Sequence, residues 1–152
     1  MQYPLKGLAF VTALMMALPV HADTNSFVVV IGNGPFSGTY HLPVAEVSCF
    51  HSVKKRVYSS GWKDFTPANA KSIAEAGIEV QDPDVPGPKF GTVLVTFGDS
   101  DKTATHYAIY HEPLTLSVAG SHGQITLRGK TKDGVQIQVT VSCLDTMEID
   151  SR

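Results

Sequence analysis

The chain has 152 residues, of which 43% are hydrophobic and 17% charged, and its formal net charge is −2. This length is enough for one domain with one hydrophobic core. A mildly acidic chain lacks the positive charge that nucleic-acid binding requires, so nucleic acid is excluded as an expected partner.

The first 22 residues have the features of a secretory signal peptide. Lys6 supplies a positive start, Leu8 to Leu18 is an apolar run of 11 residues, and Val20-His21-Ala22 resembles a cleavage site. The run is too short to span a bilayer, which takes about 20 residues. We therefore expect cleavage after Ala22, a single domain over residues 23–152 without a transmembrane span, and a secreted or periplasmic location. No cysteine directly follows the cleavage site, so we expect no lipid anchor.

The two cysteines, Cys49 and Cys143, lie 94 positions apart. Thiols of a small exported domain usually pair, because export takes them to an oxidising compartment. We predict a disulfide between them; the alternative is two separately buried thiols. In the chain-entropy model, closing a loop of about 100 residues contributes about 4–5 kcal/mol.

The first part of the chain predicts strands separated by turn residues. Phe27 to Ile31 is apolar on both faces, which favours a central strand. Gly38 to Leu42 and Val44 to Val53 follow as two further strands. In the last of these, Val47 and Cys49 share one face.

The middle of the chain is ambiguous. Trp62 and Phe65 are expected to be anchors in the core or at its rim. Thr66-Pro67 resembles the start of a helix over residues 68–76, with Gly77 after its last turn, and a loop is the alternative. Ile78 to Val80 reads as a brief strand. Gln81 to Lys89 contains three prolines and one glycine, which predicts an exposed loop.

The rest of the chain predicts a meander of short strands. The last strand alternates apolar and polar residues without interruption, which only a strand with one buried face needs. Lys132-Asp133-Gly134 before it favours a type I′ turn, and residues 144–152 form a polar tail. The predicted strands are Phe90–Phe97, Ala104–His111, Leu114–Val118, Gln124–Thr131 and Val135–Cys143. We predict an all-β antiparallel sandwich, or a partly open barrel, of about 7–9 strands, with one short helix left open.

Residue patterns for catalysis and for metal binding are missing from the sequence. There is no G-x-S-x-G elbow for a nucleophile. His106 and His111 would point to opposite faces of one strand, so they cannot chelate an ion together. Asp99-Ser-Asp101 opens like a calcium loop but lacks the later glycine and glutamate, and prolines flank Asp82 and Asp84. We therefore predict no catalytic residue, no metal site and no cofactor.

A contact surface is the more plausible functional feature. Tyrosine combines apolar area with a polar tip, and an exposed row of Tyr and His suits a contact face. The alternative is a sheet that is covered on both faces. Tyr107 and His111 lie on one face of their strand and His106 and Tyr110 on the other, so one pair should be exposed and the other buried. The predicted contact residues are therefore the exposed pair of these two, together with Asp82, Asp84 and Lys89 of the proline-rich loop.

Two resemblances bear on the fold. Cys49, Trp62 and Cys143 resemble the spacing of an immunoglobulin-type domain, although Val141 stands where that family has a tyrosine. The valine-rich first strand, Val47 before Cys49, and the ending G-V-Q-I-Q-V-T-V-S-C resemble the small mycobacterial lipoprotein antigens and related exported bacterial β-sandwich proteins. That resemblance implies a non-enzymatic envelope or secreted protein.

These observations predict an exported, non-catalytic binding or envelope-interaction module whose partner is a protein or an envelope component. One alternative is a carrier that holds a small apolar ligand between the sheets. A secreted hydrolase is another, and it would need titratable groups that converge in a cleft.

Overall fold

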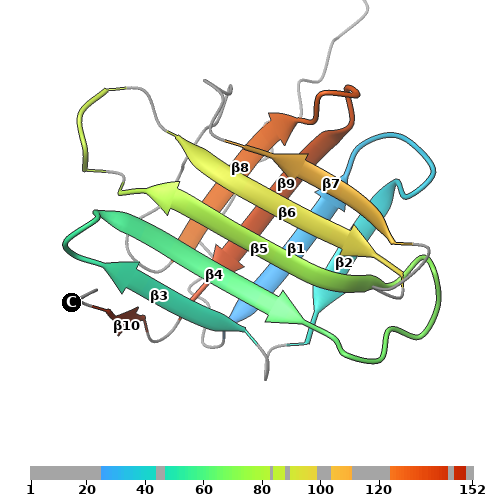
Figure 1. The fold of residues 1–152 in the computed structure, drawn as a ribbon, viewed down its shortest axis with the longest axis horizontal. Coiled ribbons are helices and arrows are strands. Elements are labelled where there is room, and N and C mark those ends of the chain that lie inside the picture. The colour runs from blue at the N-terminus through green and yellow to red at the C-terminus, as the bar shows by residue number, and fades with distance from the viewer. Residues whose placement is uncertain are drawn as a thin grey trace, which may run out of the picture.

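The protein forms two β-sheets packed face to face. The computed structural model describes residues 25–43, 47–82, 84–87, 90–98, 104–110, 124–143 and 146–149, and every regular element in these ranges is a strand. The strands are β1 (Ser26–Ile31), β2 (Gly38–Leu42), β3 (Ser48–Ser52), β4 (Val57–Lys63), β5 (Ile73–Gln81), β6 (Gly91–Phe97), β7 (Thr105–Ile109), β8 (Gln124–Lys130), β9 (Gln136–Ser142) and β10 (Met147–Glu148). Figure 1 shows the strands of one layer crossing those of the other steeply. The predicted all-β sandwich is confirmed.

The sheets draw on different parts of the chain. The four-stranded sheet has the order β2-β1-β9-β8, and the six-stranded sheet has the order β10-β3-β4-β5-β6-β7. Neighbouring strands are antiparallel except β10, which runs parallel to β3. The first and last long strands, β1 and β9, are adjacent, with Val29 opposite Val139. The prediction that Phe27 to Ile31 forms a central strand is therefore correct.

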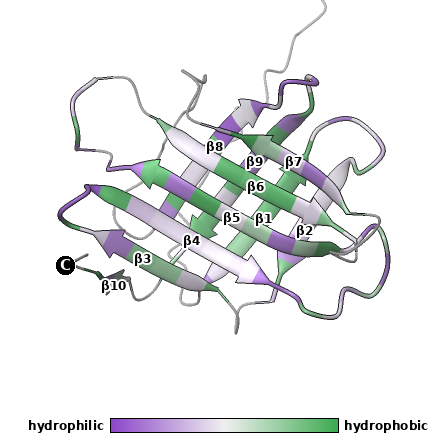
Figure 2. Cartoon of the chain, viewed as in Figure 1, coloured by the Kyte–Doolittle hydropathy of each residue, from purple (hydrophilic) through white to green (hydrophobic). Residues whose placement is uncertain are grey.

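The core lies between the sheets and follows the period of two. In β9, Ile137, Val139 and Val141 are buried, and β1 buries alternate residues in the same way. In Figure 2, green hydrophobic segments accordingly alternate with purple or white, more polar segments along many strands. The largest fully buried side chains are Phe27, Phe97, Ile31, Leu127, Val29, Val80, Val93, Val95, Val139 and Val141.

A disulfide joins the two sheets. Cys49 lies in β3 of the six-stranded sheet, and Cys143 directly follows β9 of the four-stranded sheet. Their Cα atoms are 6.2 Å apart across a sequence separation of 94 residues. The predicted pairing is confirmed, and the bond fits an oxidising compartment outside the cytoplasm.

An aromatic cluster packs the β1–β2 turn against the six-stranded sheet. The ring of Phe36, in the turn, stacks on Phe97 with centroids 4.5 Å apart and meets Tyr107 edge-on at 6.0 Å. Tyr40 packs edge-on against Phe97 and donates a hydrogen bond of 2.9 Å to the carbonyl oxygen of Phe36. Aromatic pairs of this kind contribute about 0.5–1.5 kcal/mol beyond the area they bury.

Of the two alternatives for residues 68–76, the helix is absent, and the loop alternative holds only as far as residue 72. Residues 67–72 form turns, in which the Asn69 side chain accepts a hydrogen bond of 2.8 Å from the backbone of Lys71. Residues 73–81 are β5, where Ala74, Ala76, Ile78 and Val80 are buried in alternation. Pairing with β4 and β6 on both sides outweighs the modest helix propensity of alanine and glutamate.

The middle strands also correct the prediction for Phe65. Trp62 is buried in β4 and is 5% exposed, as expected of a core anchor. Phe65 is 83% exposed, because it lies two residues beyond the end of β4, where the chain no longer faces the other sheet. The Nζ atom of Lys63 lies 5.3 Å from the centre of the Phe65 ring.

Two details of the C-terminal part differ from the prediction. In the β8–β9 turn only Gly134 has a positive φ, of 80°, and its N–H donates a hydrogen bond of 2.9 Å to the carbonyl oxygen of Thr131. This is a type I turn closed by a glycine bulge instead of type I′, because Asp133 keeps a negative φ. Part of the predicted polar tail forms β10, beside β3. The predicted strand Leu114–Val118 lies outside the described residues.

Candidate binding faces

The predicted contact residues of β7 separate into buried and exposed members. Tyr107 is 9% exposed and belongs to the core, so of the two alternative faces the one that contains Tyr107 is buried. His106 and Tyr110 are exposed on the outer side, and Nδ1 of His106 lies 3.0 Å from Oγ1 of Thr96. His111 lies outside the described residues. The outer row of β7 is therefore the exposed one.

A cleft of about 250 Å³ runs along β7 beside the β8–β9 turn. His106, Tyr107 and Tyr110 line one side of it, and Lys130 to Asp133 line the other. The exposed predicted residues of β7 thus lie at an edge where the two sheets approach each other.

The predicted loop residues are not a single exposed group. Asp84 is exposed, whereas Asp82 is 7% exposed. Lys89 lies outside the described residues. Asp82 is therefore corrected from a contact residue to a buried one, since it takes part in a polar network at the end of the six-stranded sheet.

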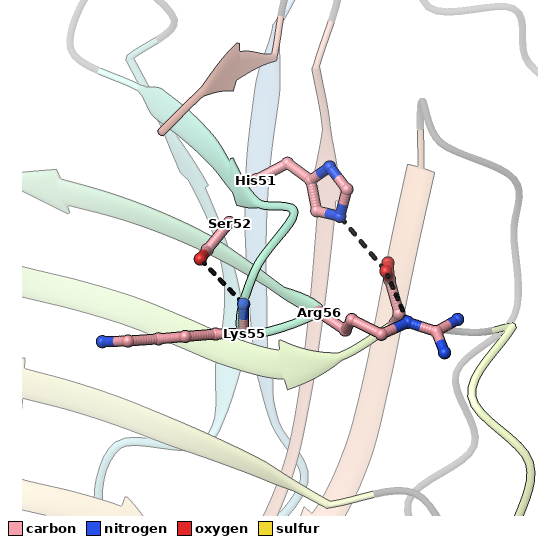
Figure 3. A network of polar contacts seen from close by, with 5 residues as sticks. His51, Ser52, Lys55 and Arg56 are labelled. Atoms are coloured by element: carbon pink, nitrogen blue, oxygen red, sulfur yellow. Dashed lines mark hydrogen bonds and ion pairs between the residues drawn. The ribbon is translucent and has the colours of Figure 1, made fainter. Parts of the chain in front are cut away.

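That network connects β3, the β3–β4 turn and the segment after β5 (Figure 3). Nε2 of His51 lies 3.2 Å from Oδ2 of Asp82, within hydrogen-bonding distance. Nε of Arg56 lies 3.9 Å from the same oxygen. Arg56 has a φ of 54°, and its carbonyl oxygen accepts a hydrogen bond of 2.8 Å from the backbone N–H of Asp82.

Tyr58 covers the other side of His51. The two rings are stacked, with centroids 4.1 Å apart. Burial raises the pKa of Tyr58 above its ordinary value of 10.0, and the negative charges of Asp82, Asp84 and Glu148 raise it further. The described contacts of this network hold three chain segments together. Sequence reasoning did not find it, because His51 and Asp82 are 31 positions apart and no local motif connects them.

The outer face of the six-stranded sheet is hollowed at its centre. Gly61 of β4 and Gly77 of β5 lie opposite each other in register, and Gly77 also faces Leu94 of β6. A hollow of about 450 Å³ lies over the two glycines, with Phe50 and Phe65 among its lining residues. A Cβ atom at either glycine would meet nothing closer than 3.8 Å, so packing within the chain does not require them.

Exposed apolar side chains gather on the same sheet. Six large hydrophobic residues are exposed within the described part of the chain, and all belong to the six-stranded sheet or to segments adjoining its strands. They are Val53, Phe65, Phe90, Tyr110, Met147 and Ile149. A second hollow of about 440 Å³, lined by Phe50 and Met147, adjoins the first one through Ser48 and Phe50.

The outer face of the four-stranded sheet has a different chemistry. Its outward residues are mainly threonines, glutamines and cations, for example Thr126, Thr140, Gln138 and Arg128. A hollow of about 480 Å³ lies on this face, at the end of β8 and the start of β9. The two outer faces of the sandwich are therefore chemically distinct.

Metal-binding clusters and membrane helices are both missing from the described ranges. They contain no group of three or more His, Cys, Asp or Glu side chains that could hold a metal ion. Within the same ranges, no helix has the length and apolarity that a membrane span needs. Comparisons of the chain with protein-family models, curated proteins and solved structures found no match.

Proposed function

We propose that this chain is an exported, non-catalytic binding module that contacts a partner protein through the outer face of its six-stranded sheet. The carrying observation is that the six large hydrophobic side chains exposed in the described part of the chain all belong to that sheet or to segments adjoining its strands. Apolar patches on soluble domains commonly mark interaction sites, and the two hollows that share Phe50 connect Phe65 and Met147 into one such surface. Export is supported by the signal-like N-terminal residues and by the interlayer disulfide.

The charge pattern of this face suits a protein partner. Glu75 and Glu79 of β5 and Lys63 of β4 lie among the apolar residues, so both signs of charge are present. Protein interfaces commonly combine apolar contacts with polar and charged groups. The hollow over Gly61 and Gly77 offers a recess for a side chain of the partner.

We place binding on the outer surface instead of between the sheets. The inner side chains of both sheets pack into one continuous cluster, which leaves the outer faces and edges for contacts. For this reason we favour a partner-binding module over a carrier of an apolar ligand.

The test uses matched changes on the two faces. Phe65→Asp and Tyr110→Asp add charges at exposed apolar positions, whereas Thr126→Asp adds one to the opposite face. The immobilised chain is used to capture proteins from envelope extracts, and each captured protein is then measured against the variants. We expect a specific partner to be lost with the first two variants and retained with the third. Equal capture by all three variants would contradict the proposal.

A further inference from the structure

The four-stranded sheet carries charges of one sign. None of the described residues in β1, β2, β8 and β9 is aspartate or glutamate, although the whole chain contains 14 acidic residues. The charged side chains of these strands are Arg128 and Lys130 of β8, and His41 of β2 also lies on the outer face, opposite Val28. Figure 2 shows hydrophilic purple segments towards the arrowhead of β8.

Strand register places amides directly beside the two cations. Arg128 is opposite Gln138, and Lys130 is opposite Gln136. These four residues line the hollow of about 480 Å³ together with Val30, Gly32, Gly129 and Ile137. The hollow therefore combines two cations, two amide groups and the outward-facing side chain of Val30.

The β1–β2 turn fixes the position of Gln136. The backbone N–H of Gln136 donates a hydrogen bond of 2.7 Å to Oδ1 of Asn33, and its carbonyl oxygen accepts one of 2.9 Å from the N–H of Gly32. A Cβ atom at residue 32 would lie 3.1 Å from Cβ of Gln136, so glycine at this position leaves room for the glutamine side chain.

The two cations have no acidic neighbour in the hollow. Among the described residues, neither Arg128 nor Lys130 makes an ion pair or a side-chain hydrogen bond. Asp133, the nearest acid along the chain, lies in the β8–β9 turn and does not line the hollow. Two exposed cations beside unpaired amides offer charge-assisted hydrogen bonds to an anionic ligand.

We propose that this hollow binds an acidic polysaccharide. Arg128 and Lys130 bind carboxylate or sulfate groups on successive parts of the glycan, because side chains two residues apart on one face are about 7 Å apart along a strand. Gln136 and Gln138 bind sugar hydroxyls, since an amide both donates and accepts. Val30, which faces outward from β1, contacts the apolar side of a sugar ring.

Other anionic polymers fit this hollow less well. Its lining residues include no aromatic side chain on which a nucleobase could stack. Two cations also neutralise few phosphates, whereas nucleic-acid binding commonly uses six to ten phosphate contacts. An acidic peptide would use the cations, but each of its residues offers the amides one backbone N–H and one C=O group, fewer than the hydroxyl groups of a sugar unit.

The test is a titration of the purified chain, disulfide intact, with four probes. Polygalacturonate and dextran sulfate distinguish carboxylate from sulfate, dextran is the neutral control, and polyglutamate is the acidic peptide. We expect binding to at least one acidic glycan that weakens with added salt. The double variant Arg128→Gln/Lys130→Gln should weaken it by roughly tenfold or more.

Matched variants separate this site from general electrostatics. Lys54→Gln/Lys55→Gln removes two exposed cations from the β3–β4 turn and should leave glycan binding unchanged. Gln136→Ala/Gln138→Ala keeps both cations and should weaken the glycan but not polyglutamate. Thermal unfolding of each variant checks that the fold is intact.

Several outcomes would overturn the proposal. One is the absence of binding to either acidic glycan, and another is binding of dextran or polyglutamate as tight as that of the acidic glycans. A third is an equal loss of glycan binding in Lys54→Gln/Lys55→Gln and in Arg128→Gln/Lys130→Gln. Phe65→Asp should leave glycan binding unchanged, so the failure of either proposed face does not imply the failure of the other.

Discussion

Gly61 of β4 and Gly77 of β5 lie directly opposite each other in the middle of the six-stranded sheet. Glycine in a strand costs conformational entropy and leaves no side chain to pack, so a pair at the centre of a sheet is unfavourable for stability. Space is available at both positions, since a Cβ atom would meet no neighbour closer than 3.8 Å. The pair therefore lowers the stability of the sheet without a packing reason, which is consistent with a surface left open for contacts.

The first prediction concerns Gly77. Gly77→Ala should raise the free energy of unfolding by about 0.5–1 kcal/mol, because the site has room and its φ is not in the left-handed region. Urea unfolding at equilibrium measures the change. Gly98→Ala is the control: Gly98 has a φ of 81°, and its Cβ would lie 3.4 Å from the backbone of Ala70, so this variant should lose stability. Destabilisation by both changes would contradict the prediction.

The second prediction concerns the cross-link between the sheets. Cys49→Ser/Cys143→Ser should lower the free energy of unfolding by about 4–5 kcal/mol, because the open chain gains entropy when unfolded. Denaturant unfolding of the variant is compared with that of the parent chain with and without a reductant. The reduced parent should match the variant, and a loss below about 1 kcal/mol would show that the strands alone hold the sheets together.

The third prediction concerns the His51–Asp82 contact. Asp82→Ala should cost about 1–3 kcal/mol, because it removes the acceptor of a largely buried histidine and a contact of Arg56. Asp84→Ala changes an exposed acid two positions away and should stay within about 0.5 kcal/mol. The two variants are compared by chemical denaturation at neutral pH.

A double-mutant cycle isolates the pair itself. If the contact is the cause, Asp82→Ala should cost less in a His51→Ala background than in the parent chain. An equal cost in both backgrounds would assign the effect to other contacts of Asp82.

The fourth prediction is a loss of stability at alkaline pH. Burial raises the pKa of Tyr58 and that of Tyr40 above the ordinary value of 10.0. The unfolded chain therefore releases these protons first, so the stabilisation is complete below pH 10 and falls as the pH rises through the folded-state pKa values. Unfolding free energies measured between pH 8 and 11.5 should decline, and they should decline less in Tyr58→Phe. An equal decline in that variant would contradict the assigned role.

The sequence was sufficient where one face of a strand is buried without interruption. The alternation of Val135 to Cys143 predicted both the strand and the direction of its cysteine. The same alternation is present from Ala74 to Val80, but alanine and glutamate there also favour a helix, and the spacing of residues 70, 73, 74 and 77 imitates a helical stripe. The neighbours of β5 decided between the two, and sequence reasoning had no access to them.

The candidate faces depend on strand order, which the sequence does not state. Val30 and Arg128 are about 100 positions apart and meet because β1 and β8 flank β9. In the sequence, Gly61 lies in an ambiguous segment and Gly77 follows the last turn of a possible helix. Only the strand register shows that the two glycines are opposite each other. His51 and Asp82 are 31 positions apart in the sequence, and the turn at Arg56, whose carbonyl accepts from the N–H of Asp82, brings them together.

The position of the disulfide determines how this protein would respond to mechanical force. When the chain is pulled from its two ends, tension passes through the sulfur–sulfur bond and bypasses residues 50–142. β1 and β2 precede Cys49, so they carry the load and would be peeled away first, whereas β4 to β9 lie inside the covalent loop. A molecule stretched between two attachment points would therefore extend by a short, fixed length and then stop.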